Sequence, residues 1–248
     1  MPGIALGCNL ISARQSVGAP HVWTPADLFS GGEQGLWLDS ADVAIGSGDI
    51  ASWPNRAGGW ADPSQPVVAE RPQKGGAAWN DGVATVATNG LQSFLMSPPV
   101  NPYAPGSYTF LWAGNQTGFN YARIFSASGT TTSHRLWLNG SPNYKAQSRQ
   151  VNAAGTTVSN IGPAWVRNTE TVVGWQLRTQ DGCYSIDGGA WSAPVNWLPT
   201  GTFSPTIYSL LGWTDGSGTV EGTTRSILII SRNLSDAEVD TYAAFYGK

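Results

Sequence analysis

Residues 223–247 read TTRSILIISRNLSDAEVDTYAAFYG, and this stretch decides the fold because a strand pattern passes directly into a helix pattern. Residues 227–230 are Ile-Leu-Ile-Ile, a dense apolar run of mostly β-branched residues. Such a run, bounded by polar residues, is typical of a strand buried on both faces. The sequence therefore predicts a strand here whose two faces are both covered.

The helix that follows has well-defined end signals. Ser235 and Glu238 are three residues apart and form a capping box, in which each side chain bonds the backbone N–H of the other residue. Leu234 and Val239 stand at the two positions of a hydrophobic staple, and Gly247 ends the helix. A short C-terminal helix is therefore predicted between Ser235 and Gly247.

One face of that helix is apolar. Val239, Tyr242, Ala243 and Tyr246 recur at the three- and four-residue spacing of a stripe along one side. We expect Val239, Tyr242 and Tyr246 to pack against the sheet or to cover one open end of it.

The rest of the chain is typical of an all-β protein, because short strand patterns recur between turns rich in the 31 glycines and 16 prolines. Strands are predicted within residues 35–40, 77–90, 107–114, 122–128, 134–140, 144–150, 171–191, 206–213 and 223–232. A further short strand is predicted at residues 67–70, and a short turn capped by Thr24 at residues 25–29. The remainder of residues 139–169 is predicted as loop. About a dozen short strands at this spacing indicate a sandwich or a barrel.

Composition argues against several functional classes. The chain has 248 residues, a net charge of −3 and a charged fraction of 12%, and it has no basic run that would attract nucleic acid or an anionic membrane. No apolar run is long enough for membrane insertion, and residues 1–22 lack the basic and apolar regions of a signal peptide.

We expect one domain over residues 23–248 and a docking arm over residues 1–22. We also expect a protein that works inside the cell or leaves it by another route, such as lysis.

The order of motifs resembles the laminin G-like and concanavalin A-like jelly-roll domains over roughly residues 28–247. The resemblance rests on TVVGWQLRTQDGCYSIDGGAW at residues 171–191 and on the closing pattern from LLGW at residue 210 to Gly247. The opening, FSGGEQGLWLD at residues 29–39, is similar to a subgroup found in tailed-phage virion proteins. The resemblance implies an all-β, concanavalin A-like jelly-roll β-sandwich with a short C-terminal helix.

The same resemblance implies a non-enzymatic structural protein of a phage or phage-like virion, in a fibre, spike or decoration. Such a protein is assembled in the host cytoplasm and released by lysis. Its expected partners are other virion proteins, contacted through residues 1–22, and cell-surface polysaccharide, bound by the sandwich during host attachment; a homo-oligomer is compatible with this role. No cofactor is expected, and no metal, since the calcium ligands of many family members are not matched here. The alternative is a carbohydrate-binding module, secreted or intracellular.

Catalysis is not expected from the titratable residues. A glycanase needs two carboxylates about 5–10 Å apart across the bond that it cleaves. The Glu-x-Asp pattern of the sequence, Glu238-Val-Asp240, lies on the predicted helix, where the two residues point apart. His21 and His134 are the two histidines, and no Gly-x-Ser-x-Gly nucleophile motif accompanies them. A polysaccharide-cleaving glycanase is therefore the less favoured alternative.

The cysteines give no scaffold and no metal site. Cys8 and Cys183 are too few for a disulfide framework, and their spacing from the histidines does not match a metal site. They are interpreted as small buried thiols, and a disulfide between them is left open.

Aromatic residues beside polar ones mark the candidate glycan site. A sugar ring stacks on an aromatic face while nearby amide and guanidinium groups bond its hydroxyls. The candidate ligand-binding residues are Trp112, Asn115, Tyr121, Arg123, His134, Trp137 and Tyr144, with Arg135 and Asn143 beside them. Because side chains alternate along a strand, about half of these should point into the core. The alternative interpretation is a core tryptophan with polar turn neighbours and, for His134, a surface or hydrogen-bonding residue.

Overall fold

The structure is a computed structural model that describes residues 21–98, 107–118, 122–129, 133–138, 145–151, 157–178, 181–196, 206–212 and 220–248. Residues 1–20, which include Cys8 and most of the predicted docking arm, lie outside this range. The elements, in chain order, are η1 (Pro25–Phe29), β1 (Gly35–Asp39), η2 (Ser40–Asp42), η3 (Val68–Glu70), β2 (Gln73–Gly76), β3 (Thr85–Asn89), β4 (Phe94–Met96), β5 (Tyr108–Gln116), β6 (Ala122–Ser128), β7 (Ser133–Leu138), β8 (Lys145–Val151), β9 (Thr157–Ala164), β10 (Thr171–Leu177), β11 (Asp181–Ile186), β12 (Val195–Asn196), β13 (Ile207–Leu210), β14 (Glu221–Ile230) and α1 (Asp236–Phe245).

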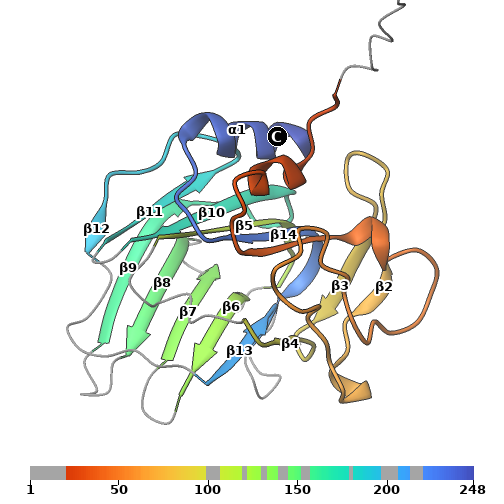
Figure 1. The fold of residues 1–248 in the computed structure, drawn as a ribbon. Helices are drawn as coiled ribbons and strands as arrows, with labels where there is room; N and C mark the ends of the chain where they lie inside the picture. Colours follow the sequence, from red (N-terminus) through yellow and green to blue (C-terminus); the bar gives the residue numbers. More distant parts are fainter. Residues whose placement is uncertain are drawn as a thin grey trace, which may run out of the picture.

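Two antiparallel sheets form the molecule. Sheet A has the order β12-β11-β10-β5-β14-β3-β2, and β1 pairs with β14 beside that path. Sheet B has the order β4-β13-β6-β7-β8-β9. In Figure 1, β6 to β9 and β13 form one layer, and β10, β5 and β14 run in the layer beneath α1. The predicted all-β jelly-roll sandwich with one short C-terminal helix is confirmed.

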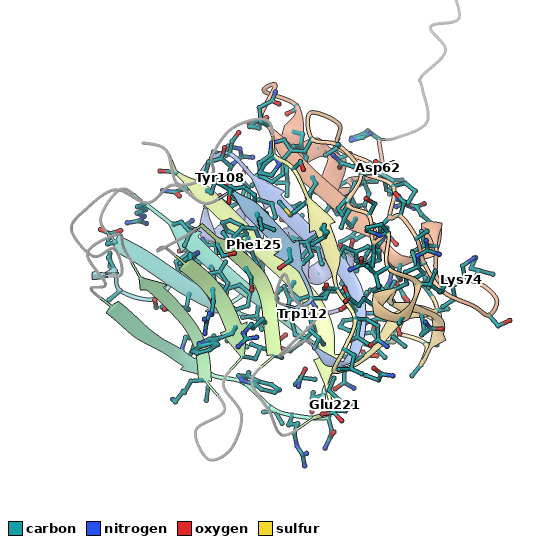
Figure 2. All side chains as sticks on the ribbon, turned by 90° about the horizontal axis from the view of Figure 1, so that it is seen from below. Asp62, Lys74, Tyr108, Trp112, Phe125 and Glu221 are labelled. Atoms are coloured by element: carbon teal, nitrogen blue, oxygen red, sulfur yellow. The ribbon has the colours of Figure 1, made fainter. Side chains whose placement is uncertain are left out.

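The main core lies between the two sheets. Phe110 of β5 faces Phe125 of β6 with ring centroids 4.8 Å apart, and Trp112 and Trp175 of sheet A are buried beside them. Figure 2 shows Trp112 and Phe125 in the middle of the molecule. Eight of the ten tryptophans in the described part of the chain are buried, so most of these large side chains fill the core.

A second core lies on the outer face of sheet A, beneath α1. Val239, Tyr242 and Tyr246 of the helix are each 0% exposed and pack with Leu228 and Ile230 of β14. The outward residues of β14 thus meet the helix, while its inward residues join the main core. The predicted helix packing and the predicted burial of both faces of this strand are confirmed.

The start of α1 has the predicted cap. The Ser235 Oγ accepts a hydrogen bond from the backbone N–H of Glu238 at 3.3 Å, and the Glu238 carboxylate accepts from the backbone N–H of Ser235 at 2.8 Å. Arg232 also reaches this carboxylate, with 2.7 Å between Nη2 and Oε1. Burial alone would raise the pKa of Glu238, but the hydrogen bonds from Arg232 and Ser235 hold it below its usual value.

The first and last strands close sheet A against each other. Gly35 stands opposite Ile230 in the register, and Asp39 stands opposite Ser226. The Ser226 Oγ donates to the Leu38 carbonyl at 2.8 Å and accepts from the hydroxyls of two helix tyrosines, Tyr242 at 3.0 Å and Tyr246 at 2.8 Å. One small polar side chain therefore joins β14, β1 and α1.

A buried ion pair strengthens the same junction. Arg225 of β14 and Asp39 of β1 are in contact, with side chains that are 6% and 2% exposed. Asp81 lies 3.0 Å from the Arg225 Nε, and Arg56 lies 3.2 Å from the second Asp39 oxygen. Burial alone would lower the pKa of Arg225, but the nearby Asp39 carboxylate outweighs it and the pKa is raised.

Two local expectations were wrong. Residues 157–164, which fall in the predicted loop, form β9 at the edge of sheet B. An edge strand is paired on one side only, so it tolerates a polar sequence and Pro163. Residues 68–70 form the 3-10 helix η3 instead of a strand, and Val67 and Val68 remain 48% and 63% exposed. These valines have no sheet against which to bury an alternating pattern.

Candidate functional site

The outer face of sheet B is the candidate binding surface. The inner faces of both sheets meet in the core, and α1 covers the outer face of sheet A. In the described part of the chain, the α-helix thus leaves the outer face of sheet B clear, as Figure 1 shows. This face is where strand side chains can meet a ligand.

The residues on that face come from the alternation of β6 and β7. Leu136 and Leu138 of β7 point into the core, so Arg135 and Trp137 between them point outward. A bulge in β6 between Arg123 and Phe125 brings Arg123 opposite Trp137 in the register. The structure therefore brings together two candidate residues, Arg123 and Trp137, across neighbouring strands.

Arginine and tryptophan are in contact on this face. The Arg135 guanidinium lies 5.8 Å from the centroid of the Trp137 ring, within the range of a cation–π interaction. Trp137 is only 8% exposed, so its ring is not an open platform for stacking. Arg123 and Arg135 are half-buried, and their guanidinium groups are donors fixed in a planar fork. The chemistry of the face is therefore hydrogen-bond donation by cations beside a largely buried tryptophan.

Basic residues continue onto β8. Lys145 is half-buried and precedes the inward Ala146, so it lies on the outward side of the strand. In the pairing of β7 with β8, Arg149 stands directly opposite Arg135. Lys145 and Arg149 are not among the candidate residues predicted from the sequence, and the signal available for both was their shared charge.

Two candidate residues lie in the core. Trp112 is 0% exposed, and its indole N–H donates to the Thr224 Oγ1 at 3.0 Å, so its ring is not accessible to a ligand. His134 is also 0% exposed, opposite the inward Ala127. Its interpretation as a surface residue is wrong, because the alternation of β7 turns it inward. Burial lowers the pKa of His134 to about 3 and keeps the imidazole neutral.

The other candidates are distributed differently. Asn115 lies in β5 of sheet A, opposite Thr223, and so in the other layer from Arg123 and Trp137. Tyr121, Asn143 and Tyr144 lie outside the described residues. The candidate site as the structure defines it is therefore built on Arg123, Arg135 and Trp137, with Lys145 beside them.

Of the two acidic residues of the catalytic alternative, Glu238 has a structural role and Asp240 is exposed. Glu238 caps α1 and pairs with Arg232, and Asp240 lies on the exposed side of the same helix.

Within the described residues, no group of three or more His, Cys, Asp or Glu side chains could hold a metal ion. Cys183 is buried in β11, and burial raises the pKa of its thiol. In the same residues, no helix is both long enough and apolar enough to cross a membrane.

Comparison with known proteins places the fold among solved β-sandwich domains. Models of known protein families give no match to this chain, and curated protein sequences give none either. The CBM40 domain of the Ruminococcus gnavus IT-sialidase is similar with a TM-score of 0.52 and 16% identity, over 66% of this chain and 96% of that domain. That domain has also been solved bound to alpha2,3 sialyllactose.

Two further domains match more of this chain. Domain 4 of a GH43 extracellular arabinanase from Geobacillus stearothermophilus, solved in complex with arabinotriose, has a TM-score of 0.59 and 12% identity, over 85% of this chain and 98% of that one. The botulinum neurotoxin serotype D binding domain has a TM-score of 0.58 and 9% identity, over 85% of this chain and 51% of that one. At these identities the likeness shows the fold, a lectin-like jelly-roll sandwich.

Proposed function

We propose that this chain is a non-enzymatic carbohydrate-binding β-sandwich, and that a glycan lies across the outer face of sheet B. The observation that carries the proposal is the grouping of Arg123, Arg135 and Trp137 on the sheet face that α1 leaves clear. The fold shared with domains solved in complex with sialyllactose and arabinotriose supports it.

The geometry sharpens how a sugar would be held. Because Trp137 is only 8% exposed, the arginines supply the main contacts, as donors to hydroxyl or carboxylate oxygens. Tyr121 and Tyr144 directly precede β6 and β8 in the sequence and stay predictions as stacking residues. Trp112 and His134 are left out of the proposed site because both are buried in the core.

A glycan array probed with the purified chain tests the proposal, with tryptophan fluorescence titration of each hit. We expect saturable binding that is weakened by Arg123→Ala and by Arg135→Ala. Arg178→Ala is the matched control, since Arg178 is 38% exposed and follows β10 of sheet A. Absence of any hit at millimolar sugar would contradict the proposal, and so would equal binding by all three variants.

The setting of this binding activity is the second part of the proposal. The similarity of residues 29–39 to phage virion domains supports a fibre, spike or decoration protein that contacts host surface polysaccharide. In that setting residues 1–22 dock on other virion proteins, and the protein is located in the virion. The alternative is an extracellular or intracellular carbohydrate-binding module without a particle.

Deletion of residues 2–20 separates these settings. If residues 1–22 are a docking arm, the shortened chain should still bind glycan but should no longer be incorporated into particles. Incorporation is measured by co-sedimentation of the shortened chain with virions that were assembled in its presence. Unchanged incorporation would refute the docking role and leave the binding activity standing.

A further inference from the structure

Acidic and basic residues are separated along the sequence. Between Asp81 and Glu170 there is no aspartate or glutamate, although this segment holds five of the thirteen basic residues. All sixteen acidic residues and the other eight basic ones lie outside it. The chain has a net charge of −3, yet it contains one continuous segment in which every charged residue is basic.

That segment supplies most of sheet B, besides β3 and β5 of sheet A, which hold no charged residue. β4 and β6 to β9 of sheet B all lie between Asp81 and Glu170, and β13, the remaining strand, has no charged residue. The strands of sheet B therefore contribute four basic residues and no acidic one, and these residues are Arg123, Arg135, Lys145 and Arg149.

The four basic residues lie on three adjacent strands. β6, β7 and β8 are neighbours in sheet B, with Arg123 opposite Trp137 and Arg135 opposite Arg149. Beside Arg135, the buried Ser126 Oγ of β6 makes no hydrogen bond within the described residues.

From this arrangement we infer that the glycan bound by sheet B is acidic, with carboxylate or sulfate groups on its sugars. The inference rests on the proposed carbohydrate-binding function and names its ligand class. A guanidinium binds a carboxylate through two parallel N–H···O bonds, which are about twice as strong as bonds between neutral groups. Several cations along three strands suit an oligosaccharide with more than one anionic group, and the basic face also attracts such a chain over distance.

Paired glycans test the ligand class directly. An array carries sialylated, uronate-containing and sulfated oligosaccharides, each beside its neutral counterpart, such as alpha2,3-sialyllactose beside lactose. We expect binding to one or more of the acidic members and at least roughly tenfold weaker binding to the neutral counterpart, the size expected for a lost charge-assisted hydrogen bond. The affinity should fall as the salt concentration rises, because the attraction is between charges.

Charge-removing variants locate the contact. Arg135→Gln is expected to weaken binding of the acidic glycan by roughly tenfold or more, and Lys145→Gln to weaken it less. Lys74→Gln is the matched control, since it removes one positive charge from β2, and Figure 2 shows Lys74 at the far side of the molecule from β6 to β9. Circular dichroism and melting temperature show whether each variant is folded. If Arg135→Gln does not fold, the binding measured with Lys145→Gln tests the inference instead.

The outcomes separate this inference from the proposal on which it rests. Preferential binding of neutral glycans, or full binding by both Arg135→Gln and Lys145→Gln, would overturn the acidic ligand and leave glycan binding standing. Equal binding of single-stranded DNA would also overturn it, because the face would then retain any polyanion. No binding to any glycan would overturn both.

Discussion

Tyr242 is one of the fully buried residues through which α1 packs on sheet A. It is 0% exposed, and its hydroxyl donates to the Ser226 Oγ at 3.0 Å. Tyr242→Asp should lower the free energy of unfolding by a few kcal/mol, because an unpaired charge would be buried. Tyr242→Phe should cost only about 1 kcal/mol, the net value of one hydrogen bond. Urea unfolding of both variants measures the two losses.

The control for this prediction lies on the same helix. Thr241 is exposed, so Thr241→Asp should change the unfolding free energy by less than about 0.5 kcal/mol. A wild-type melting temperature for Tyr242→Asp would show that the packing of α1 on sheet A is wrong.

His134 makes stability depend on pH in a defined direction. The pKa of His134 is about 3 in the folded chain and about 6.5 in the unfolded chain. Between these two pH values the unfolded chain binds a proton on this residue and the folded chain does not. Stability from this group is complete above pH 6.5 and is lost as the pH falls toward 3, at about 1.4 kcal/mol per pH unit.

Urea unfolding at pH 7 and pH 5 measures this slope. The His134→Gln variant should be less dependent on pH over that window, whatever its stability at pH 7. Equal slopes for the two proteins would mean that folding does not lower the pKa of His134.

The capping box of α1 is the clearest case at the scale of an element. Ser235→Ala removes the acceptor for the Glu238 backbone N–H and should cost about 1 kcal/mol of stability. The loss is measured by thermal unfolding, with Thr241→Ala on the exposed face as the control. If Ser235→Ala were no more destabilising than Thr241→Ala, the cap would contribute nothing to the fold.

Elements with local signals could be predicted from the sequence, and elements that depend on their neighbours could not. The cap residues and the apolar run at 227–230 each define an element by themselves, and both are confirmed. β9 has no such pattern. Among the described strands of its sheet it pairs with β8 alone, so its formation depends on that neighbour. Residues 67–70 have a strand-like sequence but no partner strand, and they form η3.

The candidate site was predictable only as a set of residue types. Arg123 and Trp137 were predicted from the chemistry of their side chains. Their opposed positions in the register depend on the bulge in β6, for which the local sequence has no signal. The inward side of His134 and the burial of Trp112 follow from which residues of each strand face the core. Which face of a strand is buried depends on how the two sheets pack together, and it cannot be read from the sequence of one strand.

At the scale of the whole molecule, the Arg225–Asp39 pair joins the first strand to the last. Arg225→Met leaves the Asp39 carboxylate buried with Arg56 as its remaining ion-pair partner in the described chain, and should destabilise the protein by about 3 kcal/mol or more. Adding Asp39→Asn should recover part of the loss, because the buried Asp39 charge is then removed. A double-mutant cycle by urea unfolding measures the coupling. Additive losses would show that the pair is not coupled.

The pairing of β1 with β14 also decides how the molecule would respond to mechanical load. Gly35, where the first strand begins, stands opposite Ile230, where the last strand ends, and Trp23 contacts Phe245 with ring centroids 5.8 Å apart. A force applied through both ends of the domain would first detach α1 and then peel the ladder open one pair at a time from Gly35.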